Sequence, residues 1–208
     1  MSSARILVVC TGNVCRSPFL ERRLQNSLDS IWGQNGMSVA SAGTGALVAA
    51  PIDPLSASLL ERLGVASSDF VARQLTTSMV ADSQLVLTAT RAHRGLVARL
   101  HPRSMRYTFA VADFADLVDH IPDDQMPTVT EPGEWLGQIA SLAAQRRGLH
   151  PPMAADEADI VDPYRRGPEV FQAMAAQIER WMPSLRRALG QAGGADPQRR
   201  REDPALAD

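Results

Sequence analysis

A cysteine and an arginine stand at the two ends of a short loop near the start of the chain. Five residues separate Cys10 from Arg16, and Ser17-Pro18 follow; the five are Thr11, Gly12, Asn13, Val14 and Cys15. A thiol beside a guanidinium and free backbone N–H groups should ionise readily, because each of these neighbours favours the thiolate. An arginine also holds two oxygens of one phosphoryl group at once. The loop therefore predicts a phosphate-binding site with Cys10 as the nucleophile.

The flanking segments predict a strand before this loop and a helix after it. Residues 5–9 are a short, mainly apolar run typical of a buried strand, and leucine or isoleucine recurs at helical spacing from Leu20 to Ile31. We expect Ser17 to be the N-cap of the helix, with Pro18 in its first turn. Asn13 tolerates the left-handed conformation that a tight loop needs. The free N–H groups and the dipole at such a helix start attract dianions.

This motif resembles the signature of the low-molecular-weight protein tyrosine phosphatases, which has Gly-Asn and a second cysteine inside the loop. The resemblance implies that Cys10 forms a phosphocysteine, that Arg16 and the residues from Thr11 to Cys15 bind phosphate, and that Ser17 hydrogen-bonds the sulfur. It also implies that Cys15 forms a reversible disulfide with Cys10 under oxidants.

A second chemical element lies late in the chain, at Asp162-Pro163-Tyr164. A carboxylic acid that protonates a departing phenol oxygen speeds the reaction by roughly a hundredfold or more. The tripeptide resembles the general-acid loop of the same family, which implies that Asp162 is the general acid and that Tyr164 forms one wall of an aryl pocket. Arg165-Arg166 follow where family members commonly have an aromatic residue. Three interpretations of these arginines stay open: they favour an acidic peptide, they favour a second phosphate, or they are simply solvated.

Ser41 is a supporting residue in this interpretation. The resemblance implies that Ser41 holds the phosphate loop through hydrogen bonds, in a network that often includes a histidine at the position of Phe70. This chain has no histidine there. Ser41 must therefore find another partner or leave the loop less firmly held.

The other periodic segments predict an α/β fold. Further strands are expected at residues 37–42, 84–88 and 105–109, and helices begin after Asp53 and Thr90. Strands that alternate with helices indicate a single domain with an open four-stranded parallel sheet, in the flavodoxin-like order 2-1-3-4, with helices on both faces. Ligands of such sheets bind at the carboxyl ends of the strands, where Cys10 lies.

We expect residues 1–190 to form the phosphatase domain, with residues 113–159 as an insertion before the acid loop, and residues 191–208 to be a disordered tail. A helix in the insertion should place Trp135 in the core. The last helix should run from Glu169 to about Leu189, and Pro183 should kink or split it.

Composition restricts the class of protein. The chain has 208 residues, a net charge of -2 and a pI near 6.1, and it contains no apolar run long enough to span a bilayer. We therefore expect neither nucleic acid nor a membrane as a partner. Two cysteines so close together give no disulfide framework, which fits a reducing cytoplasm. The four histidines, His93, His101, His120 and His150, lack metal-ligand spacing and are expected on the surface or at helix ends.

The sequence thus predicts a cytoplasmic phosphotyrosine-protein phosphatase that needs no metal or cofactor and is a monomer or weak dimer. One alternative is an arsenate reductase with the same fold and loop. The kind that relays electrons through further cysteines is disfavoured, because the chain has only Cys10 and Cys15. The other alternative is a non-catalytic phosphopeptide-binding module, which would need neither the thiol of Cys10 nor the acid of Asp162.

Overall fold

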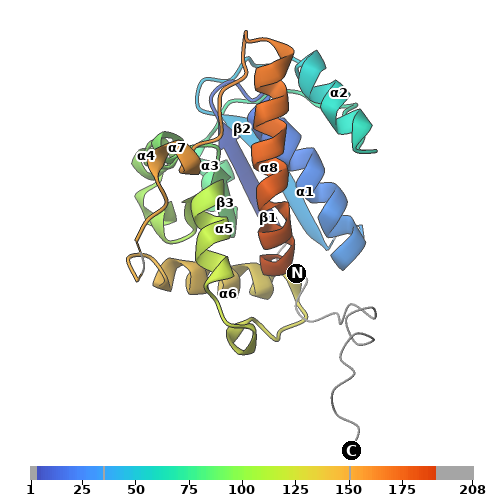
Figure 1. The fold of residues 1–208 in the computed structure, drawn as a ribbon. Coiled ribbons are helices and arrows are strands. Elements are labelled where there is room, and N and C mark those ends of the chain that lie inside the picture. Colours follow the sequence, from blue (N-terminus) through green and yellow to red (C-terminus); the bar gives the residue numbers. More distant parts are fainter. Residues whose placement is uncertain (1–3, 35, 150, 191–208) are drawn as a thin grey trace, which may run out of the picture.

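The sheet of this protein has four parallel strands. The computed structural model describes residues 4–34, 36–149 and 151–190. The strand order is β2-β1-β3-β4, as predicted. Figure 1 shows β1, β2 and β3 behind α5 and α8. β1 pairs with β2 along its whole length and with β3 over residues 6–9. The strands are β1 (Ala4–Cys10), β2 (Met37–Gly43), β3 (Leu85–Thr88) and β4 (Thr108–Ala110).

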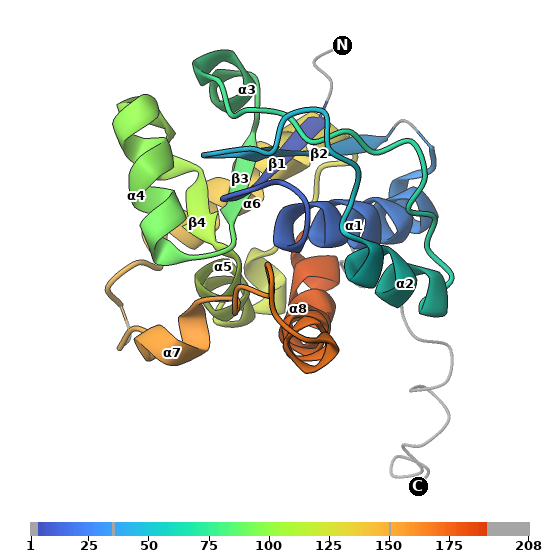
Figure 2. The same cartoon turned by 90° about the horizontal axis from the view of Figure 1, so that it is seen from above.

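Helices cover both faces of the sheet, which confirms the predicted fold class (Figure 2). On one face lie α3 and α4, and on the other lie α1, α5 and α8. The helices are α1 (Arg16–Trp32), α2 (Pro54–Arg62), α3 (Thr77–Ala81), α4 (Arg91–Leu100), α5 (Val111–Asp119), α6 (Pro132–Gln145), α7 (Ala155–Ala158) and α8 (Pro168–Ala188). Two short 3-10 helices are η1 (Pro102–Arg106) and η2 (Asp123–Gln125).

Side chains of β1 alternate between two hydrophobic cores. Ile6 and Val8 point into the larger core, which α1, α5, α6 and α8 complete. Leu7 and Val9 point into a smaller core beneath α3 and α4. A strand that is buried on both faces is a continuous apolar run without polar alternation, and this is the pattern that the sequence shows.

Two predicted boundaries are wrong. The fourth strand begins at Thr108, because Pro102–Arg106 forms η1 and leaves the Met105 side chain 45% exposed. A proline lacks the N–H of a strand ladder but suits the first turn of a helix. The first helix begins at Arg16, and its N-cap is Cys15 rather than Ser17. The Ser17 hydroxyl does not cap the helix because it bonds other side chains of the phosphate loop.

The segment expected as an insertion, residues 113–159, contributes most of α5 and all of α6 and α7. Trp135 of α6 lies in the core, as predicted; its Nε1 donates to the carbonyl of Ala188 at 2.8 Å, and its ring meets Trp32 edge-on. The last helix, α8, is not split by Pro183. The proline faces solvent while Met182 and Leu185 on either side of it are buried, so packing keeps the helix continuous.

Two expectations concern residues outside the described ones: the disordered tail at 191–208, and His150 among the four histidines. Within the described ranges, no helix is both long enough and apolar enough to cross a membrane.

Candidate active site

The phosphate loop connects the carboxyl end of β1 to the first turn of α1. Asn13 adopts the left-handed conformation, with φ of 55°, and its side chain is fully buried. Its Nδ2 donates to the hydroxyls of Ser17 (2.9 Å) and Ser41 (2.7 Å), while its Oδ1 accepts from the N–H of Arg73 (2.9 Å). The amide of Asn13 therefore fixes the loop to α1, to β2 and to the segment that follows Phe70.

The carbonyl groups of the phosphate loop face a second loop, residues 44–47. The carbonyls of Cys10, Thr11 and Gly12 accept from the N–H groups of this second loop at 2.9–3.0 Å. Gly43 permits this approach, because a Cβ there would lie 2.3 Å from the Thr11 carbonyl oxygen. In the described part of the chain, no backbone carbonyl accepts from the N–H groups of residues 11–15. These donors remain available for an anion.

The sulfur of Cys10 has a hydroxyl beside it. Cys10 Sγ lies 2.9 Å from Ser17 Oγ, and both residues are buried. Because Ser17 Oγ accepts from Asn13, its own proton is free to be donated to the sulfur. A donor at this distance stabilises negative charge on sulfur.

Cys15 is a buried free thiol. Burial raises the pKa of Cys15 to about 12, and the charges of Asp53, Cys10 and Asp162 act in the same direction. Cys15 is therefore a protonated thiol at neutral pH.

Ser41 has the partner that the sequence did not identify. Its hydroxyl donates to Glu21 Oε2 at 2.5 Å, and burial raises the pKa of Glu21. Phe70, where the family often has histidine, is buried and lies under the guanidinium of Arg22, 5.9 Å from its ring centroid. Asn13, Ser17 and Glu21 follow one another at four-residue intervals. This spacing was the signal in the sequence that could have identified Glu21 as part of the network.

The acid loop meets the phosphate loop at Arg16. The Nη2 of Arg16 lies 2.7 Å from Asp162 Oδ2, and Arg16 is only 5% exposed. Asp162 Oδ1 accepts from the N–H of Tyr164 at 3.2 Å, while the Asp162 side chain is 52% exposed. A buried guanidinium thus holds a carboxylate that solvent and substrate can reach.

Three elements anchor the start of the acid loop. Asp159 Oδ1 accepts from the N–H of Arg91 at 2.8 Å, and Ile160 donates to the carbonyl of Ala89 at 2.9 Å, so α4 and the end of β3 hold one side. Val161 donates to the side chain of Gln177 on α8 at 2.8 Å.

The phosphate loop, the acid loop and residues 44–47 enclose a cavity of about 120 Å³. Eight of the predicted site residues line it, together with Gly45 and Leu47, which the sequence analysis missed. The lining residues are Cys10, Thr11, Gly12, Val14, Cys15, Arg16, Gly45, Leu47, Asp162 and Tyr164. Asn13, Ser17 and Ser41 lie behind this wall and position it. Leu47 is 41% exposed, so an apolar side chain borders the opening.

His93 is a further residue that the sequence analysis missed. It lies in the first turn of α4, at a helix end as expected, but it is buried. Its Nε2 lies 2.8 Å from Thr11 Oγ1, and its Nδ1 lies 2.6 Å from Thr90 Oγ1. Burial, aided by the charge of Arg16, lowers the pKa of His93 to about 4. His93 is therefore a neutral partner of Thr11, the residue that follows Cys10.

Comparisons with known proteins identify the family of this chain. The family model described as low molecular weight phosphotyrosine protein phosphatase matches residues 5–134. The chain therefore belongs to this family of hydrolases.

Relatives of known name cover almost the whole chain. This chain is 30% identical over 189 residues to the probable low molecular weight protein-tyrosine-phosphatase EpsP of Ralstonia nicotianae. The match covers 89% of this chain and 97% of that protein. The crystal structure of the Erwinia amylovora tyrosine phosphatase AmsI is 28% identical, with a TM-score of 0.63 and coverage of 91% and 94%. Vibrio vulnificus Wzb in complex with benzylphosphonate is 25% identical, with a TM-score of 0.63 and coverage of 89% and 99%.

Proposed function

We propose that this protein hydrolyses phosphotyrosine in protein substrates through a phosphocysteine intermediate, without a metal ion. The observation that carries the proposal is the convergence of a nucleophile, an anion-binding group and an acid on one small cavity. Cys10, Arg16 and Asp162 all line it, and the Arg16 guanidinium contacts the Asp162 carboxylate at 2.7 Å.

Binding begins when the phosphoryl oxygens meet the loop. The free N–H groups of residues 11–15 and the guanidinium of Arg16 donate to these oxygens, and Asp162 leaves Arg16 as they arrive. Leu47 and Tyr164 border the cavity and favour an aromatic ring. Vibrio vulnificus Wzb in complex with benzylphosphonate, an aryl-bearing phosphonate, supports this mode of binding.

Two chemical steps follow. The thiolate of Cys10 attacks phosphorus and forms the S–P bond, the P–O bond to the phenol breaks, and Asp162 gives its proton to the departing oxygen. The Asp162 carboxylate then takes a proton from a water molecule whose oxygen attacks phosphorus. As the S–P bond breaks, its electrons return to the sulfur, which the hydroxyl of Ser17 stabilises.

Cys15 protects the nucleophile in this proposal. An oxidant converts the Cys10 thiolate to a sulfenic acid, which condenses with the Cys15 thiol to give a disulfide and water. The two cysteines line the same cavity, and Cys15 remains protonated at neutral pH, so it does not compete as a nucleophile. A reducing thiol restores the enzyme.

The decisive experiment measures phosphate release from a phosphotyrosine peptide in the presence of EDTA. We expect the native chain to turn over, Cys10→Ser to be inactive, and Asp162→Asn to lose roughly a hundredfold or more in kcat. Asp156→Asn is the matched control, because this exposed aspartate of α7 lies outside the cavity. A native chain that releases no phosphate without metal would contradict the proposal, and arsenate reduction and phosphopeptide binding would then be tested.

A further inference from the structure

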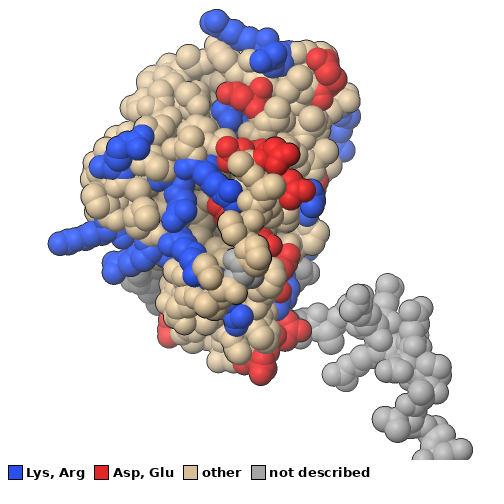
Figure 3. Space-filling model, turned by 60° about the vertical axis from the view of Figure 1, so that its left-hand side comes forward, with Lys and Arg blue, Asp and Glu red and all other residues tan. Residues whose placement is uncertain are grey.

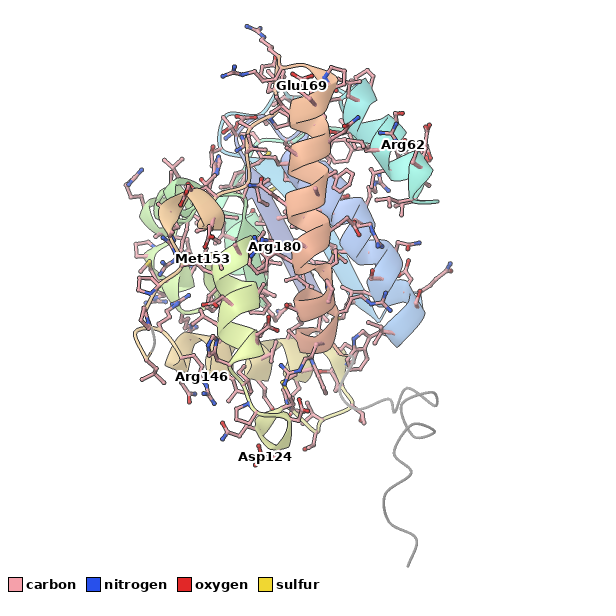
Figure 4. All side chains as sticks on the ribbon, in the orientation of Figure 1. Arg62, Asp124, Arg146, Met153, Glu169 and Arg180 are labelled. Atoms are coloured by element: carbon pink, nitrogen blue, oxygen red, sulfur yellow. The ribbon has the colours of Figure 1, made fainter. Side chains whose placement is uncertain are left out.

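A second cavity, of about 350 Å³, lies on the face of the molecule that carries α4. It shares no lining residue with the cavity around Cys10. Basic side chains gather on this face beside acidic ones (Figure 3), and Met153 of its rim lies on the side that carries α4 and α7 (Figure 4). The lining residues are Arg91, Arg94, Phe109, Asp113, Asp116, Leu117, Arg147, Gly148, Pro152 and Met153.

One of the three arginines that line the cavity already has a carboxylate partner. Arg91 donates from Nε and Nη2 to the carboxylate of Asp113 at 2.6–3.2 Å, and its Nη2 also reaches the carbonyl of Met153 at 3.0 Å. The fork geometry of this pair neutralises both charges. Arg91 and Asp113 are therefore part of the wall rather than binding groups.

The other two arginines have no carboxylate partner among the described residues. Arg147 donates to the carbonyls of Met105 (2.7 Å) and Thr108 (2.8 Å), and its guanidinium lies 4.0 Å from the centroid of the Phe109 ring. The Nε of Arg94 is buried, and no acceptor for it is found in the described part of the chain. Burial, together with the nearby charge of Arg94, lowers the pKa of Arg147 to about 10.

Arg147, which is partly desolvated, and Arg94, whose Nε is buried without an acceptor, face one cavity, and an anion between them would offset the cost of burying these cationic groups. The remaining acidic group, Asp116, lies 3.9 Å from Nδ1 of His120 on the same helix turn. The cavity lining contains three arginines and two aspartates. One positive charge of the lining is therefore not balanced, and a ligand with one negative group would balance it. Phe109, Leu117 and Met153 supply apolar surface beside it.

We propose that this cavity binds a small organic anion. Its carboxylate or phosphoryl group lies between Arg94 and Arg147, and its apolar body packs on Leu117 and Met153. The volume is at the lower end of the range for small-molecule sites, which suits a ligand about the size of one aromatic ring with its head group. Two guanidinium groups can each offer paired N–H donors to such an oxyanion.

The test uses benzoate as the probe and benzamide as its neutral match. Each is titrated into the full chain labelled with ¹⁵N, and the Nε–Hε signals of arginine are followed together with the backbone signals of Gly12. We expect benzoate to shift the signals of Arg94 and Arg147, and benzamide to leave them unchanged. Phenylphosphonate is a second arm, and its binding at the phosphate loop is read separately at Gly12. Binding of either oxyanion between the two arginines supports the proposal.

Two variants make the test specific. Arg94→Gln should weaken benzoate binding by about tenfold or more, the loss expected for one charged hydrogen-bonding partner. Arg99→Gln, an exposed arginine of α4 outside the cavity, should bind as the native chain does. The backbone spectrum of each variant verifies its fold. The proposal is overturned if neither oxyanion shifts Arg94 and Arg147, if benzamide binds equally well, or if Arg94→Gln binds unchanged.

Discussion

At the scale of single residues, His93 connects α4 to the phosphate loop. The Oγ1 of Thr90 accepts from the N–H of His93 at 3.2 Å, which leaves the Thr90 proton for Nδ1 of the ring. We infer the neutral tautomer in which Nε2 carries the hydrogen and donates to Thr11 Oγ1. The hydroxyl proton of Thr11 is then free to point into the cavity. His93 is thus a positioning residue that acts through Thr11.

This arrangement predicts different outcomes for two replacements of His93. His93→Leu removes the donor and should lower kcat/KM by about fivefold, the value of one hydrogen bond. His93→Gln keeps a side-chain N–H near Thr11 and should retain most of the activity. Because the pKa of His93 is lowered to about 4, neither variant should move the pH dependence of kcat/KM near neutrality. Steady-state kinetics with a phosphotyrosine peptide checks both statements, and equal losses in the two variants would indicate a packing role instead.

The residues that the sequence analysis identified share one property: their spacing along the chain carries the chemistry. Cys10, Arg16 and Ser17 lie within one loop, and Asp162 lies in a recognisable tripeptide. His93 acts through a contact with Thr11 that the sheet order creates, and Glu21 of α1 acts through Ser41 of β2. Pairing of β1 with β3 brings Thr90 and His93 next to Thr11, and pairing of β1 with β2 brings Ser41 next to Asn13.

At the scale of elements, capping residues predicted the starts of α2 and α4, whereas the predicted start of β4 was wrong. Asp53 and Thr90 cap α2 and α4 through their side chains, as expected. The start of β4 was misplaced because Met105 and the residues around it are compatible with both a strand and the 3-10 helix. Pro102 favours the 3-10 helix, and in the folded chain Arg147 binds the carbonyls of Met105 and Thr108 on either side of the boundary.

Trp135 is one of the buried side chains that attach helix α6 to the rest of the domain. The indole binds the Ala188 carbonyl at the end of α8 and contacts the Trp32 ring of α1, with ring centroids 5.7 Å apart. Trp135→Phe leaves the Ala188 carbonyl without its donor and removes part of the buried ring. We expect it to lower the free energy of unfolding by about 1–3 kcal/mol. The activity of the folded molecules should not change, because Trp135 lies outside both active-site loops.

Urea unfolding, with kcat measured in parallel, tests this prediction. Trp181→Phe is the matched control, since Trp181 of α8 is partly exposed and its ring lies beside the guanidinium of the exposed Arg180. It should change the unfolding free energy by less than Trp135→Phe does. Equal effects of the two substitutions would show that the contacts of Trp135 do not hold α6 in place.

At the scale of the whole molecule, the site depends on elements from both ends of the chain. The phosphate loop precedes α1, and the acid loop precedes α8. A bidentate pair between Arg23 of α1 and Glu179 of α8, at 2.7 and 3.1 Å, joins these two helices. The loops are therefore positioned by one packed unit, and local unfolding of α8 would remove the acid from the site.

The response of this unit to acid follows from its buried ionisable groups. The pKa of His93 is lowered from 6.5 to about 4 in the folded protein, so the unfolded chain binds the proton more readily. The stability that neutral His93 contributes is complete above its unfolded pKa and is lost as pH falls from 6.5 toward 4. Glu21 acts in the opposite direction, because its raised pKa favours the protonated folded form.

Comparison of the native chain with His93→Gln at each pH isolates the histidine, because Glu21 is common to both. We expect the native free energy of unfolding to fall more steeply than that of the variant between about pH 7 and pH 4, by up to about 3 kcal/mol. Urea unfolding across this range measures the two slopes. If they were parallel, His93 would have the same pKa in the folded and unfolded chains, and a buried neutral ring between Thr11 and Thr90 would be contradicted.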